Sequence, residues 1–189
     1  MPAIRRAARS FALTTISLGV AATATVGVSL AAAPAQAADR EAVALNETQY
    51  SQVEKKDAER RKSSERKESS RLQSAVSVAL AQRGDPYSYG ASGPNAFDCS
   101  GLIQYSYGRA GINLPRTSDA QAGATRRIAK DDMRPGDLMF FTGSGGVYHA
   151  AIFVRWEDGR AVMVHSPSTG RSVTVSSPWT DSWFAGTLR

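Results

Sequence analysis

The stretch "FDCSGLIQYSYGRAG", residues 97–111, contains the only cysteine of the 189-residue chain and predicts a helix that begins beside it. One face of this helix is marked by residues at helical spacing, namely Leu102, Ile103, Ser106 and Tyr107. The pattern predicts a start at Asp98 or Cys99 and an end at Gly111. The Cys99 sulfur would then lie among unpaired backbone N–H groups at the positive end of the helix dipole, which favours the thiolate. Such a position can lower a thiol pKa from about 8.5 to about 3.5–7.5, as a nucleophile requires.

Residues 1–37 predict a secretory signal peptide. Basic residues precede an acid-free run of small and apolar residues, 11–33, which is followed by "APAQA" with expected cleavage after Ala37. The alternative is a retained membrane anchor, because the run is long enough to span a bilayer. We expect the general export route, since nothing after the pair Arg5 and Arg6 resembles the usual twin-arginine continuation.

Residues 38–71 are rich in charges of both signs and contain neither Pro nor Gly. Large apolar residues are too sparse in this segment to bury a core or to stabilise a coiled coil. We therefore expect a flexible or transiently helical tether, with a helix that binds the cell wall or a partner as the alternative.

Residues 72–189 predict one compact α+β catalytic domain with helices first and an antiparallel sheet afterwards. Apolar residues at helical spacing predict a first helix that ends near Gly84, and Thr117 or Ser118 is expected to cap a short third helix. The later segments alternate as strands do, in the order "LMFF", "YHAAIFVRW", "RAVMVH", "SVTV" and "WFAGTL".

The net charge excludes some classes of partner. The chain has 23 Lys and Arg against 17 Asp and Glu, a formal charge of +6, but three of the arginines lie in the predicted leader. The remainder, at +3, lacks the clustered basic and aromatic residues of a nucleic-acid-binding surface, although mild positive charge suits an anionic cell envelope. We expect an extracytoplasmic monomer with no membrane anchor after cleavage and no cofactor. A metal site is disfavoured because one Cys and two His lack a fourth ligand.

The two histidines, His149 and His165, bracket a predicted hairpin. A two-residue turn at Asp158 and Gly159 with regular pairing would place the histidines on opposite faces of the sheet. A three-residue loop or one bulge would instead put Ala151 opposite His165, so that both histidines share a face as diagonal neighbours about 7–8 Å apart. A catalytic pair therefore requires an odd loop or a bulge in this hairpin.

A lone cysteine in an exported chain is a buried small residue, an intermolecular bridge or a reactive group. The pair of histidines favours the reactive group. His149 would take the proton of Cys99 and later protonate a leaving amine, while His165 would hold the tautomer of His149 and stabilise its charged form. The backbone N–H of Cys99 would form part of an oxyanion hole, a kind of contact that contributes about 3–4 kcal/mol per donor. This chain order of nucleophile, base and orienting residue is papain-like.

The chain resembles the NlpC/P60 family of bacterial cell-wall cysteine peptidases. The resemblance covers residues 73–189 and is carried by "PYSYGASGPNAFDCSGLIQYSYGRAGINLPRTSDAQ", "RPGDLMFF", "YHAAIFV" and "MVHSPSTG". It implies a papain-like α+β fold and hydrolysis of peptidoglycan stem peptides through an acyl-enzyme, at the bond from the D-γ-glutamyl carbonyl to a diamino acid. It also implies that Cys99 is the nucleophile, His149 the base and His165 the third polar residue.

The same resemblance implies three further site residues, two of which have a structural alternative. Tyr87 would line the site and offer its hydroxyl to the oxyanion, or pack the loop that follows Pro86. Asp98 would attract a substrate ammonium, or only cap the helix, and Ser100 would help to place the substrate. Arg116 and Gln121 are expected to tie the third helix to the domain, with contact to the substrate as the alternative.

Other positions are expected to be structural. The segment "PGD", 135–137, is most simply a turn before the first strand. The three tryptophans are interpreted as packing residues rather than as sugar-stacking platforms, with the lining of a groove as the alternative for Trp179. Ala91 and Ala151 stand where glycine is common in the family, and the methyl of Ala151 could narrow the site.

Two other functions are compatible with this scaffold. A non-catalytic wall-binding module would keep the fold without needing the cysteine and both histidines. An amidase or acyltransferase would retain all three residues and act on a different bond.

Overall fold

The computed structural model describes residues 35–189. The chain divides into two units, Met1–Thr48 and Gln49–Arg189, and the candidate site belongs entirely to the second. Most of the predicted signal peptide therefore lies outside the described residues. None of the helices between residues 35 and 189 combines the length and apolarity that a membrane span requires.

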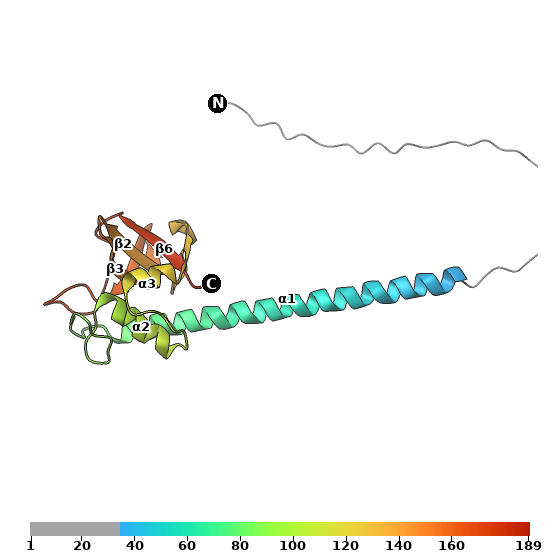
Figure 1. The fold of residues 1–189 in the computed structure, drawn as a ribbon, viewed down its shortest axis with the longest axis horizontal. Helices are drawn as coiled ribbons and strands as arrows, with labels where there is room; N and C mark the ends of the chain where they lie inside the picture. Colours follow the sequence, from blue (N-terminus) through green and yellow to red (C-terminus); the bar gives the residue numbers. More distant parts are fainter. Residues whose placement is uncertain (1–34) are drawn as a thin grey trace, which may run out of the picture. The chain divides into compact units, whose positions relative to one another are not determined.

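Helix α1 (Ala35–Ala81) includes the whole charged segment and continues through the helix that the sequence predicts from Leu72 (Figure 1). The absence of Pro and Gly permits this continuity. Between residues 49 and 71 the side chains are exposed, apart from the partly exposed Glu68, whereas Leu72, Ala75 and Ala79 are buried. Burial thus begins at the boundary predicted between tether and domain, and the division into these two parts stays a prediction.

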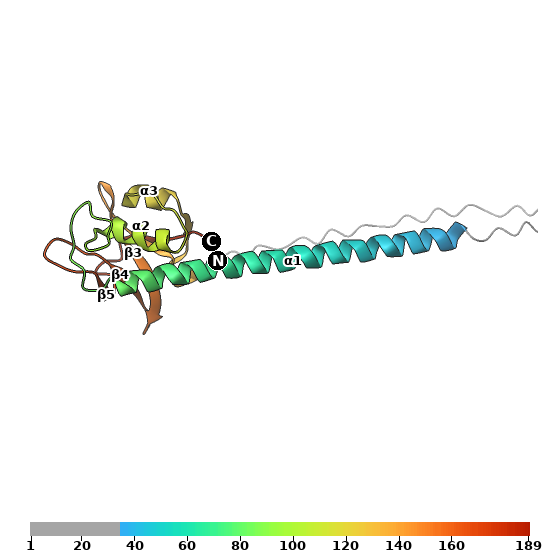
Figure 2. The same ribbon diagram turned by 90° about the horizontal axis from the view of Figure 1, so that it is seen from below.

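Helices α2 (Cys99–Arg109) and α3 (Ser118–Gly123) start where the sequence predicts. Asp98 is the N-cap of α2 and accepts the backbone N–H of Gly101, and Thr117 is the N-cap of α3 and accepts the N–H of Ala120. Both helices pack on the long strand β3, as Figure 2 illustrates from below. A short 3₁₀ turn, η1 (Lys130–Asp132), follows α3.

The sheet has six antiparallel strands in the order β1-β6-β2-β3-β4-β5. Their bounds are β1 (Arg126–Ile128), β2 (Leu138–Gly143), β3 (Gly146–Glu157), β4 (Arg160–His165), β5 (Thr174–Ser176) and β6 (Trp183–Thr187). The predicted α+β class, with helices before an antiparallel sheet, is confirmed. The sequence did not predict β1, because its three residues show neither apolar alternation nor turn residues at both ends.

Both faces of the sheet are covered by apolar side chains. Alternate residues of β3 divide between the faces: Ala150 and Ile152 pack with the helices, and Ala151 and Phe153 pack on the other side with Phe141. We call the face that packs against the helices the helix face. We call the opposite face the tryptophan face, because Trp183 belongs to its core. By the same alternation His149 belongs to the tryptophan face.

The hairpin between β3 and β4 contains the irregularity that a histidine pair requires. Asp158 and Gly159 form a two-residue turn with φ of 48° and 73°, and Glu157 pairs with Arg160. The register then shifts between Phe153 and Arg155, which leaves one extra residue in β3. The prediction of an odd loop or a bulge is therefore confirmed, with the bulge as the solution.

The segment before β2 is more than a turn. The Asp137 carboxylate is buried, accepts the backbone N–H of Arg134 at 2.7 Å and pairs with the guanidinium of Arg189 at 2.5 Å. The turn thereby ties the last residue of the chain to the start of β2.

Candidate active site

The two histidines meet on the tryptophan face. Nε2 of His149 lies 2.9 Å from Nδ1 of His165, and each residue is 4% exposed. Nε2 of His165 lies 3.1 Å from the hydroxyl of Ser176 in β5. Three neighbouring strands therefore supply a continuous row of hydrogen-bonding groups.

The row determines which nitrogen of His149 can act as a base. Because Nε2 faces His165, only Nδ1 remains for Cys99. A neutral His149 can accept a proton at Nδ1 when Nε2 carries the hydrogen and donates it to His165. His165 must then carry its own hydrogen on Nε2 and donate it to Ser176. The sequence analysis missed Ser176. Its only signal is strand alternation: Thr174 pairs with His165, and Ser176, two residues later in β5, lies on the same face of the sheet.

Cys99 is the first residue of α2 and is partly exposed. The backbone N–H groups of Ala150, Ser100 and Cys99 itself lie close enough to the sulfur to lower its pKa. Ala150 follows His149 in β3, so the thiol lies beside the strand that carries His149. In the described part of the chain, the sulfur makes no hydrogen bond to the His149 ring.

The predicted lowering of the Cys99 pKa is wrong. Burial raises the pKa of the thiol, the N–H contacts lower it in part, the negative charge of Asp98 raises it further, and the net shift is upward. The helix start is present as predicted, but the cost of burying a thiolate outweighs it. The sequence could locate the helix start and could not show how deeply the sulfur is buried.

Burial acts on the histidines in the opposite direction. It lowers the pKa of His149 to about 3, with a further contribution from His165, and lowers the pKa of His165 to about 4, with a contribution from Arg171. At neutral pH the site therefore holds a protonated thiol and two neutral imidazoles.

Asp98 is fully engaged by groups of the protein. Its carboxylate accepts backbone N–H groups of Gly90 and Gly101 and forms two contacts with Arg116, at 2.9 and 2.5 Å. Burial alone would raise the pKa of Asp98, but the hydrogen bonds from Arg116 and the two backbone groups bring it below its usual value. This arrangement supports the capping interpretation over the capture of a substrate ammonium, because Arg116 already neutralises the carboxylate.

Ser100 belongs to the same network. Its hydroxyl lies 3.3 Å from Asp98 and 3.0 Å from Arg116. Gln121 is buried and donates to the backbone oxygens of Ser100 and Pro115, each at 2.9 Å. The prediction that Arg116 and Gln121 tie the α3 region to the domain is confirmed.

Tyr87 lies in the loop before α2, where its backbone N–H donates to Arg171. Burial raises the pKa of Tyr87, and the charges of Cys99 and Asp98 raise it further. Its hydroxyl is therefore protonated at neutral pH and can serve as a donor.

Trp179 covers the histidine pair. Its ring centroid lies 5.2 Å from that of His149 and 5.7 Å from that of His165, and it stacks on Phe141 at 4.6 Å with an interplanar angle of 7°. The indole is nevertheless 54% exposed. Trp179 thus separates the imidazoles from solvent and presents one aromatic surface outward, so it combines the packing and groove-lining roles.

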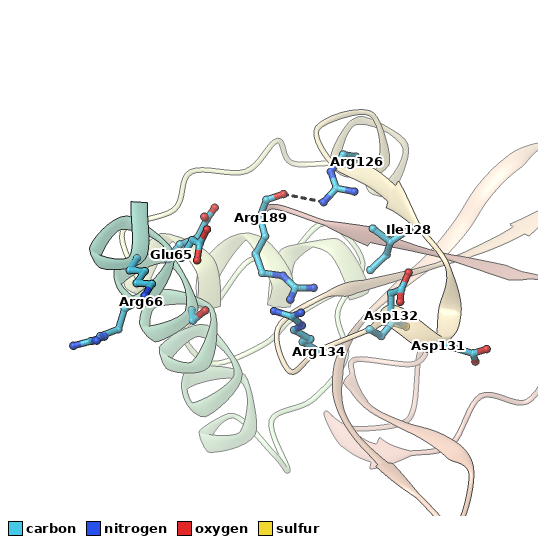
Figure 3. Close-up of a pocket in the computed structure, with 12 residues that line it drawn as sticks. Glu65, Arg66, Arg126, Ile128, Asp131, Asp132, Arg134 and Arg189 are labelled. Atoms are coloured by element: carbon cyan, nitrogen blue, oxygen red, sulfur yellow. Dashed lines mark hydrogen bonds between the residues drawn. The ribbon is translucent and has the colours of Figure 1, made fainter. Parts of the chain in front are cut away.

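A cleft of about 950 Å³ elsewhere on the domain contains none of these residues. It lies between α1 and the β1–η1 region, with side chains of both charges and the hydrogen bond from Arg126 to Arg189 at its edge (Figure 3). Within residues 35–189 no group of three or more His, Cys, Asp or Glu side chains is arranged to hold a metal ion.

The fold is that of a known family. Residues 84–189 match the NlpC/P60 family, and the chain belongs to it. The probable endopeptidase p60 of Listeria monocytogenes is 43% identical over 95 residues, which cover 49% of this chain and 19% of p60. The bifunctional muramidase/DL-endopeptidase CwlT of Bacillus subtilis is 40% identical over 102 residues, which cover 52% of this chain and 30% of CwlT. The chain thus spans less than a third of the length of these relatives.

Solved structures include both catalytic and non-catalytic relatives. The NlpC/p60 domain of the peptidoglycan hydrolase SagA superposes with a TM-score of 0.55 and 31% identity, over 62% of this chain and 98% of that domain. RipD of Mycobacterium tuberculosis is described as a non-catalytic NlpC/p60 domain protein adapted to peptidoglycan binding. It superposes with a TM-score of 0.53 and 28% identity, over 63% of this chain and 98% of RipD.

Proposed function

We propose that the chain is an extracytoplasmic cysteine endopeptidase that hydrolyses peptidoglycan stem peptides between the D-γ-glutamyl carbonyl and the diamino acid. The observation that carries this proposal is the 2.9 Å contact between His149 and His165, which leaves Nδ1 of His149 free on the strand that touches the Cys99 sulfur. The names of SagA and CwlT support the substrate and the type of bond.

The first half of the reaction forms an acyl-enzyme. The neutral His149 accepts the thiol proton at Nδ1 as the Cys99 sulfur attacks the carbonyl carbon. The backbone N–H of Cys99 and the hydroxyl of Tyr87 donate to the oxyanion, and His165 stabilises the imidazolium of His149. The carbon–nitrogen bond then breaks as His149 returns the proton to the leaving amine.

The second half releases the new carboxylate. His149, neutral again, takes a proton from water, whose oxygen attacks the thioester carbonyl. The thiolate leaves and recovers the proton from His149. The site therefore separates charge only during the reaction, which agrees with a raised thiol pKa and lowered histidine pKa values in the free protein.

The main alternative is a binding module of the RipD kind. The free Nδ1 of His149, the Cys99 thiol beside it and the row from His165 to Ser176 favour catalysis, because binding alone requires none of them. The secretory leader and the monomeric state stay predictions, as does the absence of nucleic-acid and membrane partners.

The test is mass spectrometry of purified peptidoglycan digested with the wild-type chain and with Cys99→Ala. We expect new D-γ-glutamyl carboxyl ends with the wild type alone. Identical fragments from both proteins, together with retained sedimentation of Cys99→Ala with the wall, would favour the binding module. Fragments cut between the sugar and the first amino acid would show an amidase instead.

A further inference from the structure

A second cleft, of about 400 Å³, lies on the tryptophan face. All three tryptophans of the chain line it, namely Trp156, Trp179 and Trp183. Its other walls are the end of the β3–β4 hairpin, the start of η1 and the segment Pro178–Asp181. We call it the tryptophan cleft.

Trp179 connects this cleft with the histidine pair. The same indole that lines the cleft lies 5.2 Å from the His149 ring. Trp156 lies near the far end of β3, seven residues after His149, so at about 3.3 Å per residue it lies roughly 20 Å along the strand from the base. A substrate that left the site past Trp179 would follow the cleft.

The chemistry of the proposed reaction determines which part of the substrate lies on this side. His149 donates its proton to the leaving amine, so the leaving group must lie against His149. The acyl group lies toward Tyr87 and the start of α2, where the oxyanion donors are. The leaving group of a stem peptide is the diamino acid together with everything bonded to it.

We propose that the tryptophan cleft binds the leaving half of a cross-linked substrate, that is, the diamino acid and the neighbouring stem peptide attached to its second amine. This inference rests on the proposed function. A free diamino acid with its terminal residues spans only two or three residues beyond the scissile bond, whereas roughly 20 Å of extended chain corresponds to about six residues. Only the cross-linked form is long enough to reach Trp156.

The walls of the cleft suit such a peptide. Trp156 and Trp179 are 39% and 54% exposed, so their rings can cover methylene groups or face an ammonium group. One such contact already exists inside the protein: Nζ of Lys130 lies 4.0 Å from the centroid of the Trp183 ring.

Charges of both signs line the same cleft. Lys130 and Arg160 provide positive charge, and Asp131 and Asp181 provide negative charge. A cross-linked stem peptide carries both carboxylates and amines, so it can pair with both. A purely apolar or purely anionic ligand would leave one set of charges without partners.

The test compares two muropeptides from the same wall, a monomer and a peptide-cross-linked dimer, which share the scissile bond. We expect the wild type to have a higher kcat/KM for the dimer. Trp156→Ala should reduce this preference about fivefold by raising KM for the dimer, with the monomer unaffected, because one aromatic contact is removed. Trp156→Phe should retain most of the preference.

Tyr89→Ala is the matched control, since Tyr89 is an aromatic residue with 90% exposure in the loop before α2 and outside the cleft. It should leave the ratio of dimer to monomer unchanged. An equal or lower kcat/KM for the dimer with the wild type, or an unchanged ratio in Trp156→Ala, would overturn the inference and leave the proposed function intact. Failure of the wild type to cleave either muropeptide would contradict the proposed function and the inference with it.

Discussion

The Cys99 thiol and the His149 imidazole are both held in their uncharged forms by burial, which raises one pKa and lowers the other. A preformed thiolate–imidazolium pair would require the reverse order of pKa values. In the proposed mechanism, proton transfer is therefore coupled to nucleophilic attack. The imidazolium and the oxyanion exist only while the oxyanion donors stabilise the negative charge.

Alkylation of the thiol tests this state directly. Because Cys99 is the only cysteine, iodoacetamide labels a single site. We expect the alkylation rate to be slow at neutral pH and to keep rising with pH beyond the range of an ordinary cysteine, since the pKa is raised. A rate that is already high and constant between about pH 5 and 8 would show a thiolate–imidazolium pair instead.

Ser176 acts at the other end of the histidine row, 3.1 Å from Nε2 of His165. In Ser176→Ala the hydrogen of His165 is free to move to Nδ1, which would donate to His149 and leave the hydrogen of His149 on the catalytic nitrogen. We expect kcat to fall about five- to tenfold, equivalent to one hydrogen bond of about 1 kcal/mol, with KM unchanged.

The control variants separate tautomer control from simple packing. Ser176→Thr keeps the hydroxyl and should restore kcat. Ser177→Ala removes a hydroxyl from the residue that follows β5. Among the described residues the hydrogen bond to Nε2 of His165 comes from Ser176 and not from Ser177, so this variant should have no effect. A loss of kcat in Ser176→Thr equal to that in Ser176→Ala would refute the role of the hydroxyl.

At the scale of the element, α2 must approach the preceding loop closely enough to place Cys99. A Cβ at Gly101 would lie 2.0 Å from the backbone oxygen of Ala91 and 2.9 Å from Oδ1 of Asp98. Gly101→Ala should therefore displace the loop or the cap and lower the free energy of unfolding by about 1–3 kcal/mol, with a loss of activity. Urea denaturation and hydrolysis assays measure both effects.

Gly108 provides the matched comparison in the same helix, because a Cβ there would meet nothing within 4 Å. Gly108→Ala should leave activity unchanged and stabilise the protein by up to about 1 kcal/mol through helix propensity. Equal stability and activity of the two alanine variants would show that the close approach at Gly101 has no role.

The sequence predicted the elements whose signals are local. Capping residues located the starts of α2 and α3, and the turn at Asp158 and Gly159 was readable from its residues. The sequence predicted either a three-residue loop or a bulge in the β3–β4 hairpin, and the structure has the bulge. The sequence could not decide between them because the position of the extra residue depends on side-chain packing on both faces of the sheet. The direction of the Cys99 pKa shift was mistaken for a related reason: burial depends on the strand that packs over the helix start.

At the scale of the whole molecule, a sheet with apolar cores on both faces allows the histidines to be buried at the sheet, with the Trp179 ring packed against both of them. The same arrangement puts the tryptophan cleft on the face of the base and Asp98 with Arg116 at the start of α2. The acyl and leaving halves of a substrate would therefore contact different surfaces of the protein. Substitutions in the tryptophan cleft would then change the preference for cross-linked substrates without changing the catalytic residues.

Burial of two histidines also makes the stability of the domain depend on pH. Their pKa values are about 3 and about 4 in the folded state, against about 6.5 in the unfolded chain. Between these limits the unfolded state binds protons that the folded state does not, so the free energy of unfolding must fall as pH falls. From pH 7 to pH 5, above the range in which Asp98 titrates, each histidine should remove up to about 2 kcal/mol.

Urea denaturation at pH 7 and pH 5 measures this loss for the wild type and for the double variant His149→Gln with His165→Asn. The double variant should be less stable at pH 7, because the amide pair fills the site less well, but its stability should change little between the two pH values. The difference in slope, and not the absolute stability, isolates the histidines. Equal slopes in the two proteins would mean that both imidazoles accept protons in the folded state, and the neutral base on which the proposed mechanism depends would have to be abandoned.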